Sequence, residues 1–254
     1  MRLQRISLTL SQLRSIPDDE RSLIVVLAHA LNEINALNKL FFLCTNIEHE
    51  PRWKAHAHAS QAFILARTLV GKLNEAWSTV KVGYFRSRIS KTYSSSLEAT
   101  ANEALNHLKG YFGRKNLLTE VRNNFAFHYS LDQAKTSIPD DTPAEDLTIY
   151  LHEDHGNSLY QFAEYIMSKA LIDAISPTDP EAALGTLLSE MATVVAALNE
   201  FVQGLLFVVF DKHISEDLLR QSVEQVDVGA VPLSSDVTIP YFFKIARSTH
   251  GSAA

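Results

Sequence analysis

The apolar residues of this chain recur at alternating steps of four and three positions over long stretches. In the first such stretch, about residues 19–46, the series runs through Leu23, Leu27, Ala30, Ile34, Leu37, Phe41 and Cys44. This spacing places the apolar side chains on one face of an α-helix. Further apolar residues widen that face, so the pattern predicts a helix of a globular bundle rather than a two-stranded coiled coil.

The same spacing continues along the chain and predicts an all-α fold, a multi-helix bundle of long amphipathic helices. The stretch after Pro51 carries many alanines on its apolar face, which permits a close approach between helices. Gly and Pro number only 9 and 8, which favours long helices over a turn-rich β fold. The expected helices cover about residues 19–46, 52–81, 97–113, 115 onward, 158–175 and 180–212.

One region, residues 136–157, interrupts the helical pattern. It begins with an acidic loop that contains two prolines, and residues 147–151 then have the composition of a short strand. Gly156 and Asn157 follow as a turn signal. We therefore expect a small β-hairpin or loop insertion here.

The C-terminal part of the chain also departs from the pattern. Residues 214–224 suggest one short helix, and the sequence then becomes an extended tail. The apolar cluster at 239–243 is expected to dock on the rest of the protein. We thus divide the chain into a helical bundle at 1–213, which carries the insertion, and a short helix with a docked tail at 214–254.

The most apolar stretch, residues 191–210, is long enough to raise the question of a membrane span. It contains Asn199, Glu200 and Gln203 near its middle. A glutamate at the centre of a bilayer is costly. We interpret the stretch as a buried core helix and expect no membrane contact.

Charge and cysteine content limit the classes of function and compartment. The net charge is −6 with a single cysteine, which argues against broad non-specific binding to nucleic acid but leaves room for a small basic cleft. One cysteine permits neither an intrachain disulfide nor a cysteine-based zinc site. The N-terminus lacks the apolar run of a signal peptide, so we expect a cytoplasmic protein.

One short segment combines residues that can act on a phosphate. Arg122 is followed by Asn123 and Asn124, and His128 comes six residues after the arginine. This segment resembles the signature of the HEPN superfamily (higher eukaryote and prokaryote nucleotide-binding helical domain), an arginine and a histidine separated by four to six residues. The resemblance implies a helical bundle, often dimeric, and in many members a metal-independent endoribonuclease of the toxin or defence type.

The residue types suit that chemistry. A histidine can exchange protons near neutral pH, and a guanidinium can hold the negative charge of a pentavalent phosphate. The resemblance therefore assigns catalysis to Arg122 and His128, with Asn123 and Asn124 in support. It implies RNA as substrate, a homodimer, and a protein partner such as an antitoxin, with no cofactor and no metal.

Other interpretations of these residues remain open. Arg52 and His58 have the same spacing, and His128 fits the apolar face of its own helix, so an ion-paired arginine and a core-edge histidine explain Arg122 and His128 equally well. In that case the protein is a non-catalytic helical interaction or nucleotide-binding module. His56 and His58 are interpreted as solvent or partner contacts.

A basic patch near the end of the second helix offers further contacts to RNA. The patch is also what an ordinary helix C-terminus, enriched in cations, looks like. The candidate phosphate contacts are Lys81, Arg86, Arg88 and Lys91.

Overall fold

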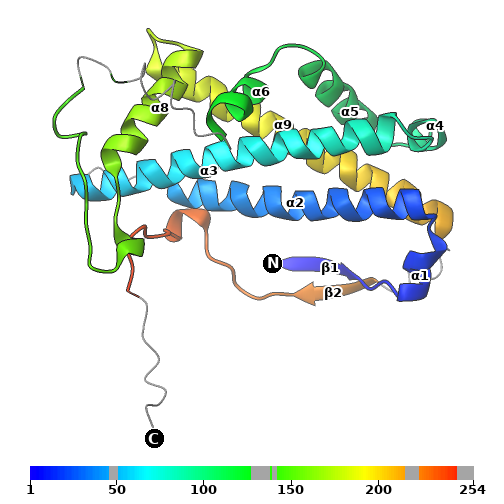
Figure 1. Ribbon diagram of the computed structural model, residues 1–254. Helices are drawn as coiled ribbons and strands as arrows, with labels where there is room; N and C mark the ends of the chain where they lie inside the picture. The colour runs from blue at the N-terminus through cyan, green and yellow to red at the C-terminus, as the bar shows by residue number, and fades with distance from the viewer. Residues whose placement is uncertain (46–50, 127–137, 139–141, 215–222, 245–254) are drawn as a thin grey trace, which may run out of the picture.

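The computed structural model describes most of the chain as helix, which confirms the prediction of an all-α bundle (Figure 1). It describes residues 1–45, 51–126, 138, 142–214 and 223–244. The longest elements are α2 (Asp18–Cys44), α3 (Arg52–Thr79) and α9 (Pro180–His213). Three of the predicted helices match these within a few residues.

The helices α2 and α3 lie side by side and antiparallel, and α9 crosses behind them (Figure 1). The shorter helix α5 (Ala99–Phe112) packs along α9, and α8 (Gln161–Ile175) contacts both α3 and α9. Leucine, valine and phenylalanine side chains of these helices meet in one continuous core. Burial of such apolar surface is the main stabilising contribution to the bundle.

The apolar stretch near 191–210 forms the middle of α9, and its side chains line the core. Val194, Leu198, Phe201 and Leu205 are each fully buried. The helix α9 is long enough and apolar enough to cross a membrane. The core helix of a globular protein can have the same length and composition. The position of α9 at the centre of the bundle is the one expected from the sequence.

The polar side chain of Asn199 in α9 pairs with a side chain of α2 at a partly buried position. Its amide and that of Asn35 in α2 exchange two hydrogen bonds, with N–O distances of 2.9 and 3.0 Å. Buried polar groups are costly unless they are paired. Both side chains are partly buried, and this reciprocal pair satisfies their polar groups within the contact between α2 and α9.

Two segments continue α-helices as π-helices, a feature that no sequence pattern indicated. The first, η1 (Val80–Phe85), extends α3, and α4 (Ile89–Tyr93) follows it closely. The second, η2 (Arg122–Ala126), continues α6 (Leu117–Val121). The wider turn of a π-helix shifts the direction of its side chains and often occurs at functional sites.

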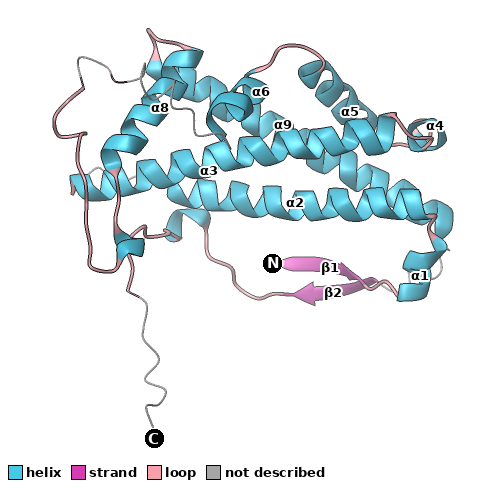
Figure 2. Cartoon of the chain, in the orientation of Figure 1, coloured by secondary structure: helices cyan, strands magenta, loops and turns pink. Residues whose placement is uncertain are grey.

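The β structure lies elsewhere than predicted. The N-terminal β1 (Arg2–Ile6) pairs antiparallel with β2 (Val223–Asp227), with Leu3 opposite Val226, beneath the helices (Figure 2). No sequence pattern indicated this sheet, because each strand has few apolar residues and the two are more than 200 positions apart. Val223 and Glu224, expected in a short helix, belong to β2, and residues 215–222 lie outside the described part.

In the insertion at 136–157, the described residues form no hairpin of paired strands. Tyr150 and Leu159 make one isolated antiparallel bridge, while Ile149 and Leu151 are 49% and 74% exposed. A strand needs a partner along its whole length to satisfy its backbone. Residues 147–151 pair with the segment that follows them only at that bridge and through a hydrogen bond from Phe162 N–H to the carbonyl of Thr148, so the segment is an extended loop rather than a strand.

Candidate functional site

Arg122 is the first residue of η2 and follows directly on α6. The residues of α6 before it fix its position. The side chain of Asn116 caps α6 by accepting a hydrogen bond from the backbone N–H of Thr119 at 2.9 Å. Leu118 and Val121 are buried in the core. They anchor the short helix, so Arg122 follows directly on a fixed element.

The guanidinium of Arg122 makes two described contacts. Its Nη2 atom donates to Oε1 of Glu75 in α3 at 2.9 Å, and Nη1 donates to the side-chain oxygen of Asn123 at 3.2 Å. The side chains of Arg122 and Glu75 are 34% and 56% exposed. An ion pair this open to water contributes little stability, so a competing anion can displace Glu75 at small cost.

These residues border a pocket of about 420 Å³, which we call the Arg122 pocket. It lies between the end of α3 and the start of η1 on one side and the segment 112–123 on the other. Its lining includes four cationic side chains and two carboxylates. They are Lys81, Arg114, Lys115 and Arg122, with Glu75 and Glu120.

The cations of the Arg122 pocket differ in how far they are already neutralised. Lys115 lies 2.6 Å from Glu120, and this hydrogen bond raises the pKa of Lys115. Lys81 and Arg114 form no ion pair within the described part of the chain. Both are exposed, so their charges are available to an anion that enters the pocket.

Aromatic and amide side chains keep the pocket wall in place. Trp77 and Phe112 stack with ring centroids 5.2 Å apart and planes 13° from parallel. Asn74 donates to the carbonyls of Val70 and Leu118. The ring stack joins α3 to α5 and the bond to Leu118 joins α3 to α6, so the groups that carry charge project from a rigid support.

The structure places only some of the sequence-predicted site residues. Arg122 and Asn123 line the pocket, whereas Asn124 is exposed and is not part of the lining. His128 lies outside the described residues, so its distance from Arg122 is untested. The ion pair with Glu75 agrees with the alternative interpretation of Arg122 as an ion-paired arginine.

The predicted basic patch is divided between two places. Lys81 belongs to the Arg122 pocket, while Arg86, Arg88 and Lys91 line a separate hollow of about 860 Å³ near the start of α2. That hollow also contains three acidic side chains, those of Asp18, Asp19 and Glu20. Its charges balance, which makes the Arg122 pocket the more favourable place for phosphate.

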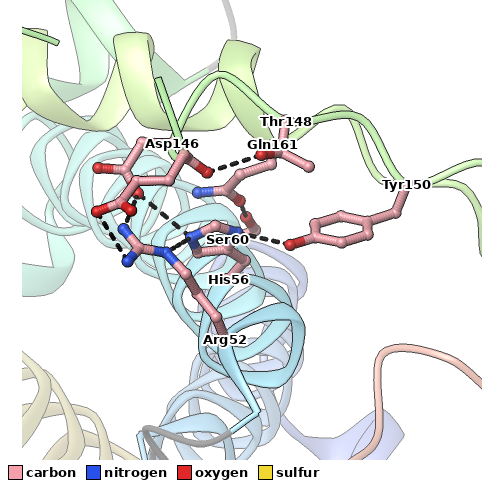
Figure 3. A network of polar contacts seen from close by, with 8 residues as sticks. Arg52, His56, Ser60, Asp146, Thr148, Tyr150 and Gln161 are labelled. Atoms are coloured by element: carbon pink, nitrogen blue, oxygen red, sulfur yellow. Dashed lines mark hydrogen bonds and ion pairs between the residues drawn. The ribbon is translucent and has the colours of Figure 1, made fainter. Parts of the chain in front are cut away.

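A second arginine–histidine cluster, which spacing alone did not single out, surrounds His56 in α3 (Figure 3). His56 Nδ1 lies 3.0 Å from the hydroxyl of Tyr150, and Nε2 lies 3.3 Å from both Asp146 Oδ1 and Arg52 Nε. Arg52 also donates to Asp146 at 2.9 Å. The interpretation of His56 and His58 as solvent or partner contacts is wrong, because both are buried within the chain.

This cluster joins α3 to the loop that carries Asp146 and Tyr150, and it is not an open site. The side chain of His56 is 9% exposed, and Tyr150 belongs to the loop that the cluster holds against α3 (Figure 3). The ring of Phe242, from the C-terminal tail, packs on Trp53 and Tyr150 with centroids 5.7 and 6.4 Å away. The four-residue spacing of Arg52 and His56 was the one sequence signal for it.

The C-terminal tail is held by a second contact. The side chain of Asn157 donates to the backbone carbonyl of Phe243 at 2.7 Å and accepts from its N–H at 3.0 Å. The hydroxyl of Tyr241 donates to the carbonyl of Ser158. The apolar cluster at 239–243 therefore reaches the 142–160 loop by polar as well as aromatic contacts.

Another polar cluster joins α2, α4 and α9 at one end of the bundle (Figure 1). Glu20 in the first turn of α2 accepts from Tyr93 and lies 2.7 Å from Nε2 of His213, the last residue of α9. Burial, and then the carboxylate of Glu20, raise the pKa of Tyr93. An acid at a helix start and a histidine at a helix end both suit the helix dipoles.

Among the residues that the structure describes, no group of three histidine, cysteine, aspartate or glutamate side chains is arranged to hold a metal ion. In the stretch His152–His155, which could supply ligands, the backbone N–H of Asp154 donates to Nδ1 of His152 at 2.9 Å. That segment is an ordinary local turn.

Comparisons with known proteins identify no relative from which a function could be assigned. A search of protein-family models, of curated proteins and of solved structures found no match. The resemblance to the HEPN signature therefore depends on the segment 122–128 and on the helical bundle that carries it.

Proposed function

We propose that this protein binds RNA at the Arg122 pocket and acts there as a HEPN-like, metal-independent endoribonuclease. In this proposal Arg122 holds the scissile phosphate and His128 transfers protons, while Asn123 orients the guanidinium. The active form is a cytoplasmic homodimer, restrained by a protein partner such as an antitoxin. The helical bundle is the fold class that the resemblance implies.

The single observation that carries the proposal is the surroundings of Arg122. A partly exposed guanidinium borders a pocket whose other cations include Lys81 and Arg114, and neither of these is neutralised within the described chain. On a chain with net charge −6, such a concentration of cations is suited to a small anionic group. A phosphodiester has the size and the charge for it.

The proposed reaction is a transesterification within the RNA. A base removes the proton of a 2′-hydroxyl, and that oxygen attacks the adjacent phosphorus. The bond to the 5′-oxygen of the next nucleotide breaks as that oxygen receives a proton, which leaves a 2′,3′-cyclic phosphate. Arg122 stabilises the negative charge that gathers on phosphorus, after the phosphate has displaced Glu75.

One observation favours a second candidate, a non-catalytic helical interaction or nucleotide-binding module. Arg122 is already paired with Glu75 at 2.9 Å and also contacts Asn123. In such a module these contacts would be purely structural. A stable partner recovered with protein that lacks nuclease activity would favour this candidate.

The deciding experiment measures cleavage of RNA by purified protein in the presence of EDTA. We compare wild type with His128→Ala and Arg122→Ala, and use His155→Ala as a matched control because His155 is exposed in a distant turn. The expected result is activity in wild type and control and a loss of at least about 100-fold in the two site variants. Undiminished cleavage by His128→Ala would remove its assigned role.

A further inference from the structure

A second pocket, of about 460 Å³, lies between α3 and α8, and we call it the α3–α8 pocket. It is separate from the Arg122 pocket and shares none of its lining residues. Pro143 and Pro180 contribute to its edge. The volume falls within the usual range for small-molecule sites.

The wall of the α3–α8 pocket includes polar side chains that are almost wholly buried. Ser60, Gln161 and Ser168 are 3%, 5% and 8% exposed. The hydroxyl of Ser60 donates to the side-chain oxygen of Gln161 at 2.8 Å (Figure 3). This bond uses the acceptor of Gln161, while its amide N–H₂ group makes no hydrogen bond within the described part of the chain.

The hydroxyl of Ser168 is also unused. It is buried and has no hydrogen-bond partner among the described residues, although a buried hydroxyl normally has one. Ser168 and Gln161 lie on α8 and line the same pocket. Two polar groups with spare hydrogen-bonding capacity thus come from one helix.

The charged residues around the pocket neutralise one another. Glu164 accepts from Arg67 at 2.8 Å, and Asp173 lies 3.0 Å from Lys169. A charged ligand would have to break one of these pairs. The remaining wall is apolar or aromatic and includes Phe63, Tyr165 and Ile172.

We propose that the α3–α8 pocket binds a small, uncharged molecule that has a flat ring and a hydrogen-bond acceptor, such as a carbonyl oxygen or a ring nitrogen. The ring packs against the apolar wall, and the acceptor receives hydrogen bonds from the amide of Gln161 and the hydroxyl of Ser168. The site is independent of the proposed ribonuclease activity.

The test uses ligand-observed NMR and calorimetric titration of the full chain with three probes, nicotinamide, adenine and cytosine. Benzene is the matched probe without an acceptor. We expect at least one of the three to bind saturably and benzene to bind more weakly. If none of the three binds up to its solubility limit, the proposal is overturned.

Two variants connect that binding to the pocket. Ser168→Ala should lower the affinity for the probe by about 3- to 10-fold, the usual effect of removing one hydrogen bond. Ser189 is an exposed serine of α9, and Ser189→Ala should leave the affinity unchanged. Ala59→Phe should fill the pocket and abolish binding. If Ala59→Phe fails to fold, Ser168→Ala still decides, because binding unaffected by that change contradicts the proposed contacts.

Discussion

The guanidinium of Arg122 donates to the carboxylate of Glu75 across 2.9 Å, joining η2 to α3 at the edge of the Arg122 pocket. Glu75 thus occupies the guanidinium of Arg122, which we propose to bind the phosphate. Because the pair is open to solvent, its net contribution to stability is small. We therefore regard Glu75 as a competitor that RNA displaces on binding.

Removing the charge of Glu75 should strengthen RNA binding. In Glu75→Gln, the phosphate no longer competes with a carboxylate for Arg122, so we expect affinity to rise by about 3- to 10-fold at low salt. Fluorescence polarisation with a labelled RNA oligonucleotide measures this. Glu103→Gln, an exposed position on α5, serves as control, and affinity that stays the same or falls in Glu75→Gln would contradict the competitor role.

The two cations of the pocket that lack a described ion pair should govern the salt dependence of RNA binding. Removing one cation that touches a phosphate should reduce the slope of log affinity against log salt by about 1. Lys81→Ala and Arg114→Ala should each show this reduction. Arg88→Ala, in the charge-balanced hollow near α2, should change the slope less. A larger effect of Arg88→Ala would indicate that RNA binds at that hollow instead.

Two glycines of α9 should respond oppositely to alanine. A Cβ at Gly204 would lie 2.5 Å from Cβ of Ala101 in α5, whereas a Cβ at Gly185 would meet nothing within 4 Å. We expect Gly204→Ala to lower the free energy of unfolding by about 1–3 kcal/mol through overpacking and Gly185→Ala to raise it by about 0.5–1 kcal/mol. Urea denaturation of both variants measures this, and equal effects would argue against the close packing of α5 on α9.

The buried tyrosines should stay neutral at pH values where exposed ones ionise. Burial raises the pKa of Tyr84, Tyr93 and Tyr111 above the ordinary value of 10.0. A raised folded-state pKa means that the stabilisation is complete below the ordinary value and is lost as pH rises through the raised one. Absorbance at 295 nm should therefore show part of the tyrosines ionising only together with the loss of helical circular dichroism; ionisation of every tyrosine near pH 10 in folded protein would contradict their burial.

The long helices were predictable because their apolar residues follow the helical period over many turns. The series from Leu23 to Cys44 marks one face of α2, and most of its members are buried. The pairing of β1 with β2 was not predictable, because contact between the ends of the chain leaves no local pattern. Residues 147–151 had the composition of a strand, but they pair with the neighbouring segment only through the single bridge of Tyr150 and Leu159 and one hydrogen bond to Thr148.

The candidate site was predictable only in part. The segment at Arg122 stood out by its residue types, yet nothing in the sequence indicated Glu75, 47 positions away, or the π-helix at Arg122. The cluster around His56 was misjudged because spacing alone does not show burial. Nothing in the sequence distinguishes Ser168 from other serines. Only the packing of α3 against α8 shows that its hydroxyl is buried without a hydrogen-bond partner among the described residues.

The most direct test of the ribonuclease proposal compares two RNA oligonucleotides of the same sequence in EDTA, one unmodified and one with every 2′-hydroxyl methylated. We predict that wild-type protein cleaves the unmodified strand, leaves 2′,3′-cyclic phosphate ends detectable by mass spectrometry, and does not cleave the methylated strand. Cleavage of both strands, or of neither, would contradict the assignment of Arg122 and His128 to ribonuclease chemistry.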